Sequence, residues 1–506
     1  MNQLPTRILE IKENGSKVVL CELPSMEAEY SALSHCWGTL QPIKLTKDTL
    51  EDFRIGVKTS SLPKTFQDAI WLADHLRIRY VWIDSLCIIQ DNPDDWARES
   101  ARMAGIFGNS FLTIAACRSA NTSEGFLIDR PERTYFPIPA RVGDLSGELL
   151  AFTMPLGHVG DNRRCVSLED EPLTERGWAL QERYLTFRTL HFGRSQIFFE
   201  CEHNFFPEDR SFAEPLHSRV YALEDYPAWS SSIICRQKWH KVIKQYSQRK
   251  LTIEDDKLPA VGGLARRFAL ETVSKNGTSI PGNRYLAGLW WDNIIRDMCW
   301  RINNHRHSRE RPGRYRAPTW SWASVNGVVD FFNTDTDLAV VQEAHVDLDT
   351  LENPFGRVTG GWIWLRALKF RPQQKSVHSS CDFIGFCEDG ADFSIYPSWD
   401  AETYYAPKHG AKADPVKGKT DLFVIPLALQ RSASSPYLIK SFFSLFFLIV
   451  KAADHQVISH VDIPGFQRVG SGIAGWHPDD TKVLRLIENK WAVAKERGEL
   501  EHMIVI

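Results

Sequence analysis

A glutamate on the apolar face of a predicted helix is the residue of this sequence best suited to do chemistry. The spacing of apolar residues predicts an amphipathic helix from Asp95 to about Phe107. Trp96 and Met103 share its apolar stripe with Glu99, so the Glu99 carboxylate points inward. Because an unpaired buried carboxylate is costly, Glu99 is either a structural group held by an ion pair or cap, or a catalytic group with a pKa adjusted by burial.

A second carboxylate ends an apolar segment, YVWID at residues 80–84, that predicts a buried parallel strand. Asp84 is followed at once by Ser85 and, two residues later, by Cys87. A carboxylate in this place can bind a ribose hydroxyl, a cation or a helix amino terminus, or it can cap the loop that follows. Cys87 could act as a nucleophile only beside a histidine base, and the nearest histidines in the sequence, His35 and His75, cannot be placed without a fold.

The segments around these residues alternate between strand and helix patterns. Strands are predicted at residues 30–36, 80–84 and 111–116, and helices at residues 63–76 and 95–107. This order implies right-handed crossovers and an α/β fold whose sheet is mainly parallel. Ligands of such sheets bind at the carboxyl ends of the strands, where this chain carries SHCWG and DSLC.

The rest of the chain shows a change from helical to β-type patterns. Residues 176–187 predict one helix, residues 211–304 are mostly helical in pattern, and the chain beyond residue 316 looks β-rich. The strongly apolar run SFFSLFFLIV, residues 441–450, has half the length of a membrane helix, which needs about 20 residues, and predicts a buried strand.

Composition excludes several classes of protein. The 506 residues suggest two or three domains, and 60 Lys and Arg against 63 Asp and Glu give a net charge of −3, so we expect no nucleic-acid partner. The first thirty residues lack the apolar core of a signal peptide, which predicts a cytoplasmic protein with no membrane partner. The 10 cysteines contain no C-x-x-C pair, which favours free thiols, and we expect no metal site.

Two local patterns carry weaker signals. GSGIAG at residues 470–475 satisfies G-x-G-x-x-G, but three residues separate it from the next predicted helix, so a turn between β-strands is favoured. The Arg-rich stretch HRHSRERPGRYR, residues 305–316, predicts a solvated surface loop, with an acidic protein or a nucleotide partner as the alternative. The motifs of P-loop proteins, zincins and α/β-hydrolases are absent from the sequence.

Several motifs in fixed order resemble the heterokaryon incompatibility (HET) domain of filamentous fungi. They are YSALSHCWG from Tyr30, LPKTFQDAI from Leu62, YVWIDSLCIIQD from Tyr80, DWARESARMAGIF from Asp95, LTIAA from Leu112 and ERGWALQER from Glu175. LPAVGGLARRF, YLAGLWW and YRAPTWSWAS resemble the carboxyl-terminal half common in this family. The expected organisation is an N-terminal β segment (1–27), a HET domain (28–200), a helical region (201–315) and a β-rich C-terminal region (316–506).

The resemblance implies a role in non-self recognition and programmed cell death when hyphae fuse. HET domains have been likened to TIR domains, flavodoxin-like α/β domains of which several hydrolyse NAD through a glutamate on the helix after a central strand. The likeness implies Glu99 as the catalytic residue and NAD as substrate rather than as a bound cofactor. It implies that nucleotide contacts come from the residues at the strand ends and the helix start: Ser34, Trp37, Gly38, Asp84, Ser85 and Trp96.

The chemistry of such a reaction needs little from the protein. Cleavage of the nicotinamide glycosidic bond passes through an oxocarbenium-like state, which one carboxylate can stabilise, and nicotinamide leaves as a neutral molecule. The alternative is a non-enzymatic adaptor that associates with itself or with an incompatibility partner. In an adaptor, Glu99 is a structural carboxylate.

Overall fold

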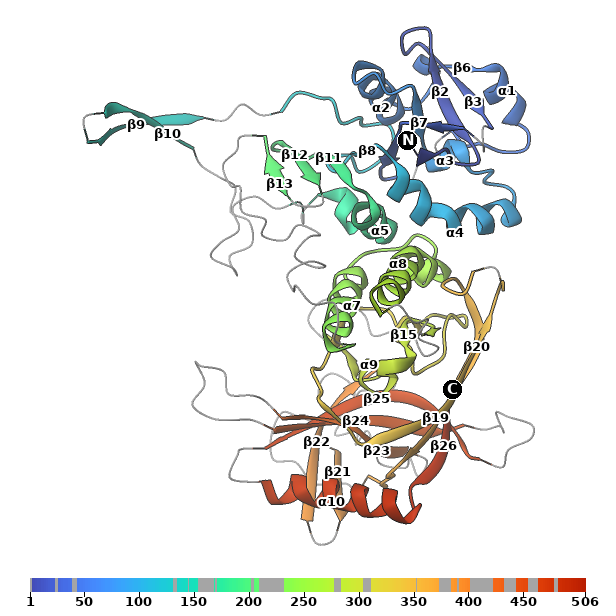
Figure 1. The fold of residues 1–506 in the computed structure, drawn as a ribbon, viewed down its shortest axis with the longest axis vertical. Helices are drawn as coiled ribbons and strands as arrows, with labels where there is room; N and C mark the ends of the chain where they lie inside the picture. The colour runs from blue at the N-terminus through green and yellow to red at the C-terminus, as the bar shows by residue number, and fades with distance from the viewer. Residues whose placement is uncertain are drawn as a thin grey trace, which may run out of the picture. The chain divides into compact units, whose positions relative to one another are not determined.

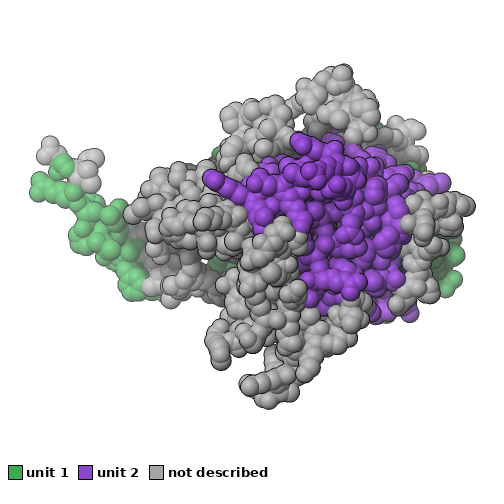
Figure 2. Space-filling view, turned by 90° about the horizontal axis from the view of Figure 1, so that it is seen from below, with its two compact units in different colours: residues 1–225 green, residues 226–506 purple. Residues whose placement is uncertain are grey.

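The computed structural model divides the chain into two compact units, residues 1–225 and 226–506, which are coloured separately in Figure 2. The structure describes residues 2–22, 26–38, 43–130, 134–143, 145–152, 168, 171–201, 204–208, 232–276, 284–303, 311–351, 353–372, 384–388, 391–400, 422–431, 443–453, 463–476 and 481–506.

A nine-stranded mixed sheet organises the first unit, in the order β13-β12-β11-β8-β5-β7-β2-β3-β6 (Figure 1). Its strands are β2 (Ile8–Lys12), β3 (Lys17–Cys21), β5 (Tyr30–Ser34), β6 (Val57–Lys58), β7 (Tyr80–Trp82), β8 (Leu112–Ala115), β11 (Arg188–Phe192), β12 (Ile197–Cys201) and β13 (Phe205–Pro207). A separate short pair joins β1 (Asn2–Gln3) to β4 (Glu27–Ala28). The sequence predicted a mainly parallel sheet, which is wrong for the sheet as a whole, because antiparallel strands extend it at both edges.

The parallel part of this sheet consists of β11, β8, β5 and β7. In chain order the strands lie second, first, third, fourth, as in the flavodoxin-like doubly wound sheet. The crossover directions reverse between β5 and β8. Such a reversal opens a crevice at the carboxyl ends of the two strands, where ligands of this kind of sheet bind.

The helices of the first unit lie on both faces of the sheet, with α2 on one side and α4 and α5 on the other (Figure 1). They are α1 (Leu50–Ile55), α2 (Lys64–His75), α3 (Asp84–Cys87), α4 (Pro93–Asn109) and α5 (Gly177–Leu185). The apolar stripe of α2 is buried at Phe66, Ala69, Ile70 and Ala73, as its spacing predicted. The last predicted member, Leu76, is 46% exposed, because the helix has already ended.

A two-stranded hairpin, β9 (Tyr135–Val142) and β10 (Leu145–Phe152), forms its own small sheet. Its strands extend away from the other elements of the first unit in Figure 1. The sequence motifs did not predict this hairpin.

The second unit is built on another nine-stranded sheet. The order β18-β23-β24-β25-β26-β20-β19 forms its main path, with β22 paired to β25 and β21 to β22. The strands are β18 (Thr336–Asp337), β19 (Ala339–Leu348), β20 (Val358–Ala367), β21 (Ile384–Glu388), β22 (Ala391–Trp399), β23 (Leu422–Arg431), β24 (Phe443–Ala452), β25 (Gly465–Trp476) and β26 (Glu501–Val505). The predicted β-rich character of the chain beyond residue 316 is therefore confirmed. The apolar run 441–450 supplies most of β24, a buried strand between β23 and β25.

The helices of the second unit are α7 (Ser232–Ser247), α8 (Pro259–Asn276), α9 (Ile294–Asp297) and α10 (Thr481–Arg497). Short 3₁₀ turns lie at Thr59–Ser61 and Pro172–Glu175 in the first unit and at Glu254–Lys257, Trp291–Asn293 and Trp322–Ser324 in the second. Two further strand pairs are β14 (Tyr285–Leu286) with β15 (Leu289–Trp290), and β16 (Trp300–Ile302) with β17 (Val329–Phe331).

Three local predictions for the second unit are wrong. Residues 285–290 were expected to be helical, but Ala287 and Gly288 take φ values of 44° and 101°, which turn the chain into the β14–β15 hairpin. Residues 470–475 lie inside β25 rather than in a turn. The Arg-rich stretch is not wholly solvated, because Arg316 is buried and donates to the Ala323 and Val325 carbonyls at 2.7 and 2.8 Å. Its residues 305–310 lie outside the described chain.

Candidate functional site

Glu99 lies on the buried face of α4, as its spacing predicted. Asn92 caps this helix by accepting a hydrogen bond from the Asp95 amide at 3.3 Å, and Asp95, Glu99, Met103, Ile106 and Phe107 are its buried residues. Trp96 was predicted to share this stripe but is only half-buried, because it points to the flank of the helix. The buried stripe thus contains two acidic residues, Asp95 and Glu99, one turn apart.

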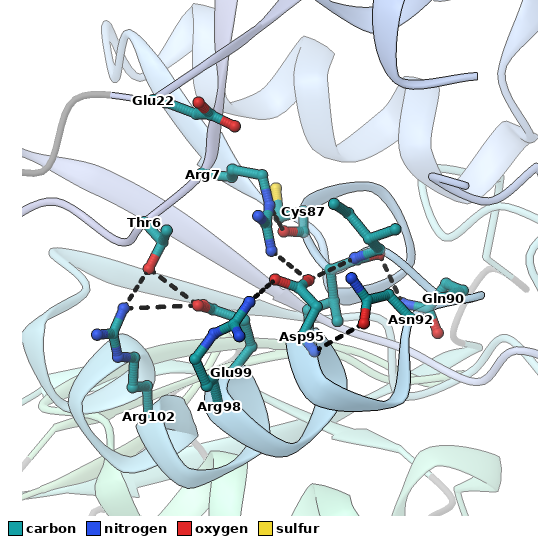
Figure 3. Close-up of polar contacts among 12 residues, drawn as sticks. Thr6, Arg7, Glu22, Cys87, Gln90, Asn92, Asp95, Arg98, Glu99 and Arg102 are labelled. Atoms are coloured by element: carbon teal, nitrogen blue, oxygen red, sulfur yellow. Dashed lines mark hydrogen bonds and ion pairs between the residues drawn. The ribbon is translucent and has the colours of Figure 1, made fainter. Parts of the chain in front are cut away.

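Both acidic residues bind the segment that precedes β2 (Figure 3). Thr6 Oγ1 donates to Glu99 Oε1 at 2.9 Å, and Arg102 Nη1 lies 3.5 Å from the same oxygen. Only 1% of Glu99 is exposed. In this geometry the Glu99 carboxylate holds α4 against the amino-terminal segment.

Asp95 is held more tightly than Glu99. Its carboxylate pairs with Arg7, lies 3.0 Å from Arg98 Nη2 and accepts a hydrogen bond from the Ile89 amide at 2.9 Å. Burial alone would raise the pKa of Asp95, but these donors outweigh it and lower the pKa below its usual value. Arg7 also donates to the Cys87 carbonyl at 2.8 Å, so the same network fixes the loop after β7.

The other predicted residues gather at the carboxyl ends of β5 and β7. Parallel pairing sets Ala32 opposite Trp82 and so brings the two strand ends together. Trp37 Nε1 donates to Asp84 Oδ2 at 2.8 Å, and the Ser85 amide donates to Asp84 Oδ1 at 2.7 Å. The structure therefore brings Trp37, Asp84 and Ser85 into one cluster. Glu99 and Trp96 lie on α4, and the Glu99 carboxylate contacts Thr6 and Arg102 instead.

Ser34 and Gly38 have different positions beside this cluster. Ser34 ends β5 and donates its hydroxyl to Glu182 on α5. Gly38 has a φ of 76°, and a Cβ at this position would lie 2.3 Å from Asn121 Cβ. Glycine is needed here for a left-handed turn and a close approach to the loop after β8.

Sequence reasoning missed the residues that join these groups, Arg176 and Glu182. Arg176 Nη2 lies 3.5 Å from Asp84 Oδ2, its Nη1 lies 3.9 Å from Glu182 Oε1, and its guanidinium lies 5.9 Å from the Trp37 ring centroid. Both residues belong to ERGWALQER, which carried the family resemblance but to which no role had been assigned. That motif was the available signal.

Burial sets the protonation of the remaining groups. His35, fully buried directly after β5 with its ring centroid 5.1 Å from that of Phe66 on α2, has its pKa lowered to about 4 by burial, against the opposing charge of Asp84, so the imidazole is neutral at pH 7. Burial raises the pKa of Cys36 to about 11 and that of Cys87 to about 12. Cys87 is therefore a protonated thiol at neutral pH, and the structure does not favour its nucleophilic role.

Two buried polar groups in the cluster have unused hydrogen-bonding capacity. The two ring nitrogens of His35 make no hydrogen bond of normal geometry among the described residues, and the same is true of the Ser85 hydroxyl. Asp84 and Arg176 carry the exposed part of the cluster, with 12% and 23% of their side chains accessible. The cluster can thus present a guanidinium, a carboxylate and an indole edge to a polar ligand.

Within the described ranges no group of three or more His, Cys, Asp or Glu residues could hold a metal ion. No helix in the part of the chain that the structure describes has the length and apolar composition needed to cross a bilayer.

The fold and the cluster define a doubly wound α/β domain with a polar site at the carboxyl ends of β5 and β7, next to the switch point between β5 and β8. Residues 30–182 match the model of the family described as heterokaryon incompatibility protein (HET), and this part of the chain is a HET domain. The match begins at the first residue of β5 and ends at Glu182, so it spans every residue of the cluster. No curated protein and no solved structure matches the chain.

Proposed function

We propose that this chain is a heterokaryon incompatibility protein that acts in non-self recognition and triggers programmed cell death. The observation that carries this proposal is the meeting of three separate HET segments at the carboxyl ends of β5 and β7. Trp37, Asp84 and Arg176 come from these three segments, and each contacts at least one of the others. A buried polar network that costs desolvation energy is expected to serve a function or to specify the fold.

Cell killing on expression in a filamentous fungus tests this role. We expect induced expression of the full chain to arrest growth and the variant Arg176→Gln to abolish that effect. The control is Arg54→Gln, because Arg54 on α1 pairs with Glu51 at 2.6 Å on the surface, away from the cluster. If Arg176→Gln still kills cells when it is present at the wild-type level, the cluster is not required for cell killing.

The enzymatic form of the proposal is TIR-like hydrolysis of NAD. It is supported by the flavodoxin-like strand order and by a buried carboxylate, Glu99, on the helix after β7. For catalysis, Glu99 would have to exchange its contacts with Thr6 and Arg102 for the ribose of the substrate. The Asp84–Arg176–Trp37 side of the cluster would hold the nucleotide, since guanidinium and indole groups bind phosphate and aromatic rings.

The direct assay measures NAD consumption and nicotinamide release by the purified full chain at high protein concentration. Turnover by the wild type that is lost in Glu99→Gln supports the enzymatic form with Glu99 as its catalytic residue. If Glu99→Gln still hydrolyses NAD, the protein is an NAD hydrolase but Glu99 is not its catalytic residue.

The second form is a non-enzymatic adaptor that associates with itself or with an incompatibility partner. The observation that favours it is the engagement of Glu99 with Thr6 and Arg102, which is a structural arrangement. An adaptor would kill with Glu99→Gln and would consume no NAD. Light scattering then compares the self-association of the wild-type full chain with that of variants that no longer kill cells.

A further inference from the structure

A cleft of about 580 Å³ in the first unit shares no residue with the Asp84–Arg176 cluster. It lies between α2, the β2–β3 turn, the loop after β8 and the β11–β12 turn. Its lining includes Trp71 and Asp74 from α2, Phe126, Ile128 and Asp129 from the loop after β8, and Phe192 at the end of β11. Lys64, Gln67 and Asp68 of its lining belong to the LPKTFQDAI motif, for which the sequence predicts no functional role.

Aromatic and apolar side chains form much of its wall. Phe126 and Phe192 are buried, and their ring centroids lie 4.7 Å apart. Trp71 and Ile128, by contrast, are 51% and 46% exposed. The cleft therefore presents apolar surface to solvent above a packed aromatic layer.

The indole of Trp71 is held in place although half of it is exposed. His75 stacks on it with 3.7 Å between ring centroids, and His75 Nδ1 is 2.8 Å from the Trp71 carbonyl oxygen in a hydrogen bond. A fixed indole loses little conformational entropy when a ligand stacks on it. The face of an indole attracts cations more strongly than other aromatic rings do.

The charges of the cleft leave an excess of carboxylates. Lys64 pairs with Asp68, which also accepts the Phe126 amide hydrogen at 2.8 Å. Arg130 pairs with Glu208. Both cations of the cleft are thus neutralised by partners.

Asp74 and Asp129 differ from the other charged residues that line the cleft. Neither carboxylate takes part in an ion pair among the described residues. An anionic ligand would be repelled by them, whereas a cation would gain two charge partners and an indole face.

We infer that this cleft binds an arginine or lysine side chain of a partner polypeptide. The cationic head lies against Trp71 and pairs with Asp74 and Asp129, and the aliphatic stem packs on Ile128. This arrangement uses the apolar and the charged surface of the cleft at once, as a long cationic side chain requires. It gives the first unit a peptide-recognition surface that is independent of the Asp84–Arg176 cluster.

The test is fluorescence anisotropy with the full chain and a short labelled peptide that contains two arginines. The matched probe carries citrulline in place of arginine, which keeps the shape and removes the charge. We expect binding of the arginine peptide and at least about tenfold weaker binding of the citrulline peptide. Equal affinity for the two peptides, or no binding of either at millimolar concentration, would overturn the inference.

Three variants locate the binding in the cleft. Trp71→Ala should weaken binding of the arginine peptide about fivefold, and the double variant Asp74→Asn with Asp129→Asn about tenfold or more. Asp48→Asn, at an exposed position before α1 and outside the cleft, removes one surface charge and should leave the affinity unchanged. If the cleft variants bind like the wild type, or if Asp48→Asn weakens binding as much as they do, the site is not in the cleft.

Discussion

The guanidinium of Arg176 lies 3.5 Å from the carboxylate of Asp84, which joins the start of α5 to the end of β7. The same guanidinium reaches toward Glu182 and donates to the His35 carbonyl. Burial by itself would lower the pKa of Arg176, but Glu182 and Asp84 outweigh burial and raise it. One arginine thus lies within ion-pair distance of both Asp84 and Glu182.

Replacement of Arg176 should therefore destabilise the first unit. Arg176→Gln removes the guanidinium beside Asp84 and Glu182, and we expect the free energy of unfolding to fall by about 2 kcal/mol. Urea denaturation, with hydrogen exchange of β5 and α5 as the local readout, measures this loss. Arg54→Gln, which breaks only surface pairs, should not change the exchange of these elements. Equal hydrogen exchange of β5 and α5 in the two variants would contradict the prediction that Arg176 stabilises these elements.

Gly38→Ala should show that the turn after β5 needs glycine. An alanine there has an unfavourable φ and also places its Cβ 2.3 Å from Asn121 Cβ. Gly15→Ala is the matched control, because Gly15 has a φ of 82° but an added Cβ meets Asp74 only at 3.5 Å. We expect Gly15→Ala to cost about 1 kcal/mol of unfolding free energy and Gly38→Ala at least about 2 kcal/mol. Thermal unfolding of the two variants makes the comparison, and equal losses would mean that the Asn121 contact relaxes freely.

Glu99→Gln should preserve the fold and so give a clean functional test. The glutamine keeps a side-chain oxygen that accepts from Thr6, and it loses only the contact with Arg102, whose side chain is 60% exposed. We expect a change of less than about 1 kcal/mol in unfolding free energy for Glu99→Gln and a loss of about 2 kcal/mol or more for Glu99→Ala. Denaturation of both variants beside wild type measures this. A large loss in Glu99→Gln would show that the charge itself stabilises α4.

Elements with one strong periodic pattern could be predicted from the sequence. Predictions failed where contacts between residues far apart in the chain, or the local backbone conformation, determine the structure. The stripe of α4 placed Glu99 inward correctly, but its partner Thr6 comes from the amino-terminal segment, which no local pattern links to α4. The helical reading of residues 285–290 failed for a similar reason. Their apolar residues suit a helix or a buried strand equally well, and the positive φ values of Ala287 and Gly288 select the hairpin.

The candidate site shows the same division between local and distant information. Asp84, Ser85 and Trp37 could be predicted because parallel strands place their carboxyl ends at one edge of a sheet. Arg176 and Glu182 could not, because the contact of Ser34 with Glu182 depends on how α5 packs after the long segment that follows β8. Only the family resemblance of ERGWALQER marked these two residues.

His35 should make the stability of the first unit depend on pH. Its pKa is about 4 in the folded chain against an ordinary value of 6.5, chiefly because burial disfavours the charged imidazole. Between these values the unfolded chain binds a proton that the folded chain does not. The contribution of the neutral histidine is therefore complete above about pH 6.5 and is lost as the pH falls toward 4.

The expected size of this effect is about 2 kcal/mol of unfolding free energy between pH 6.5 and pH 5, where most carboxylates stay ionised. Urea denaturation across this interval should show a shallower pH slope for His35→Gln than for wild type, whatever the variant costs at pH 7. His75→Gln, at an exposed position on α2, is the control for the substitution itself. A wild-type slope in His35→Gln would mean that water reaches the imidazole and that burial does not lower the pKa of His35 in the folded chain.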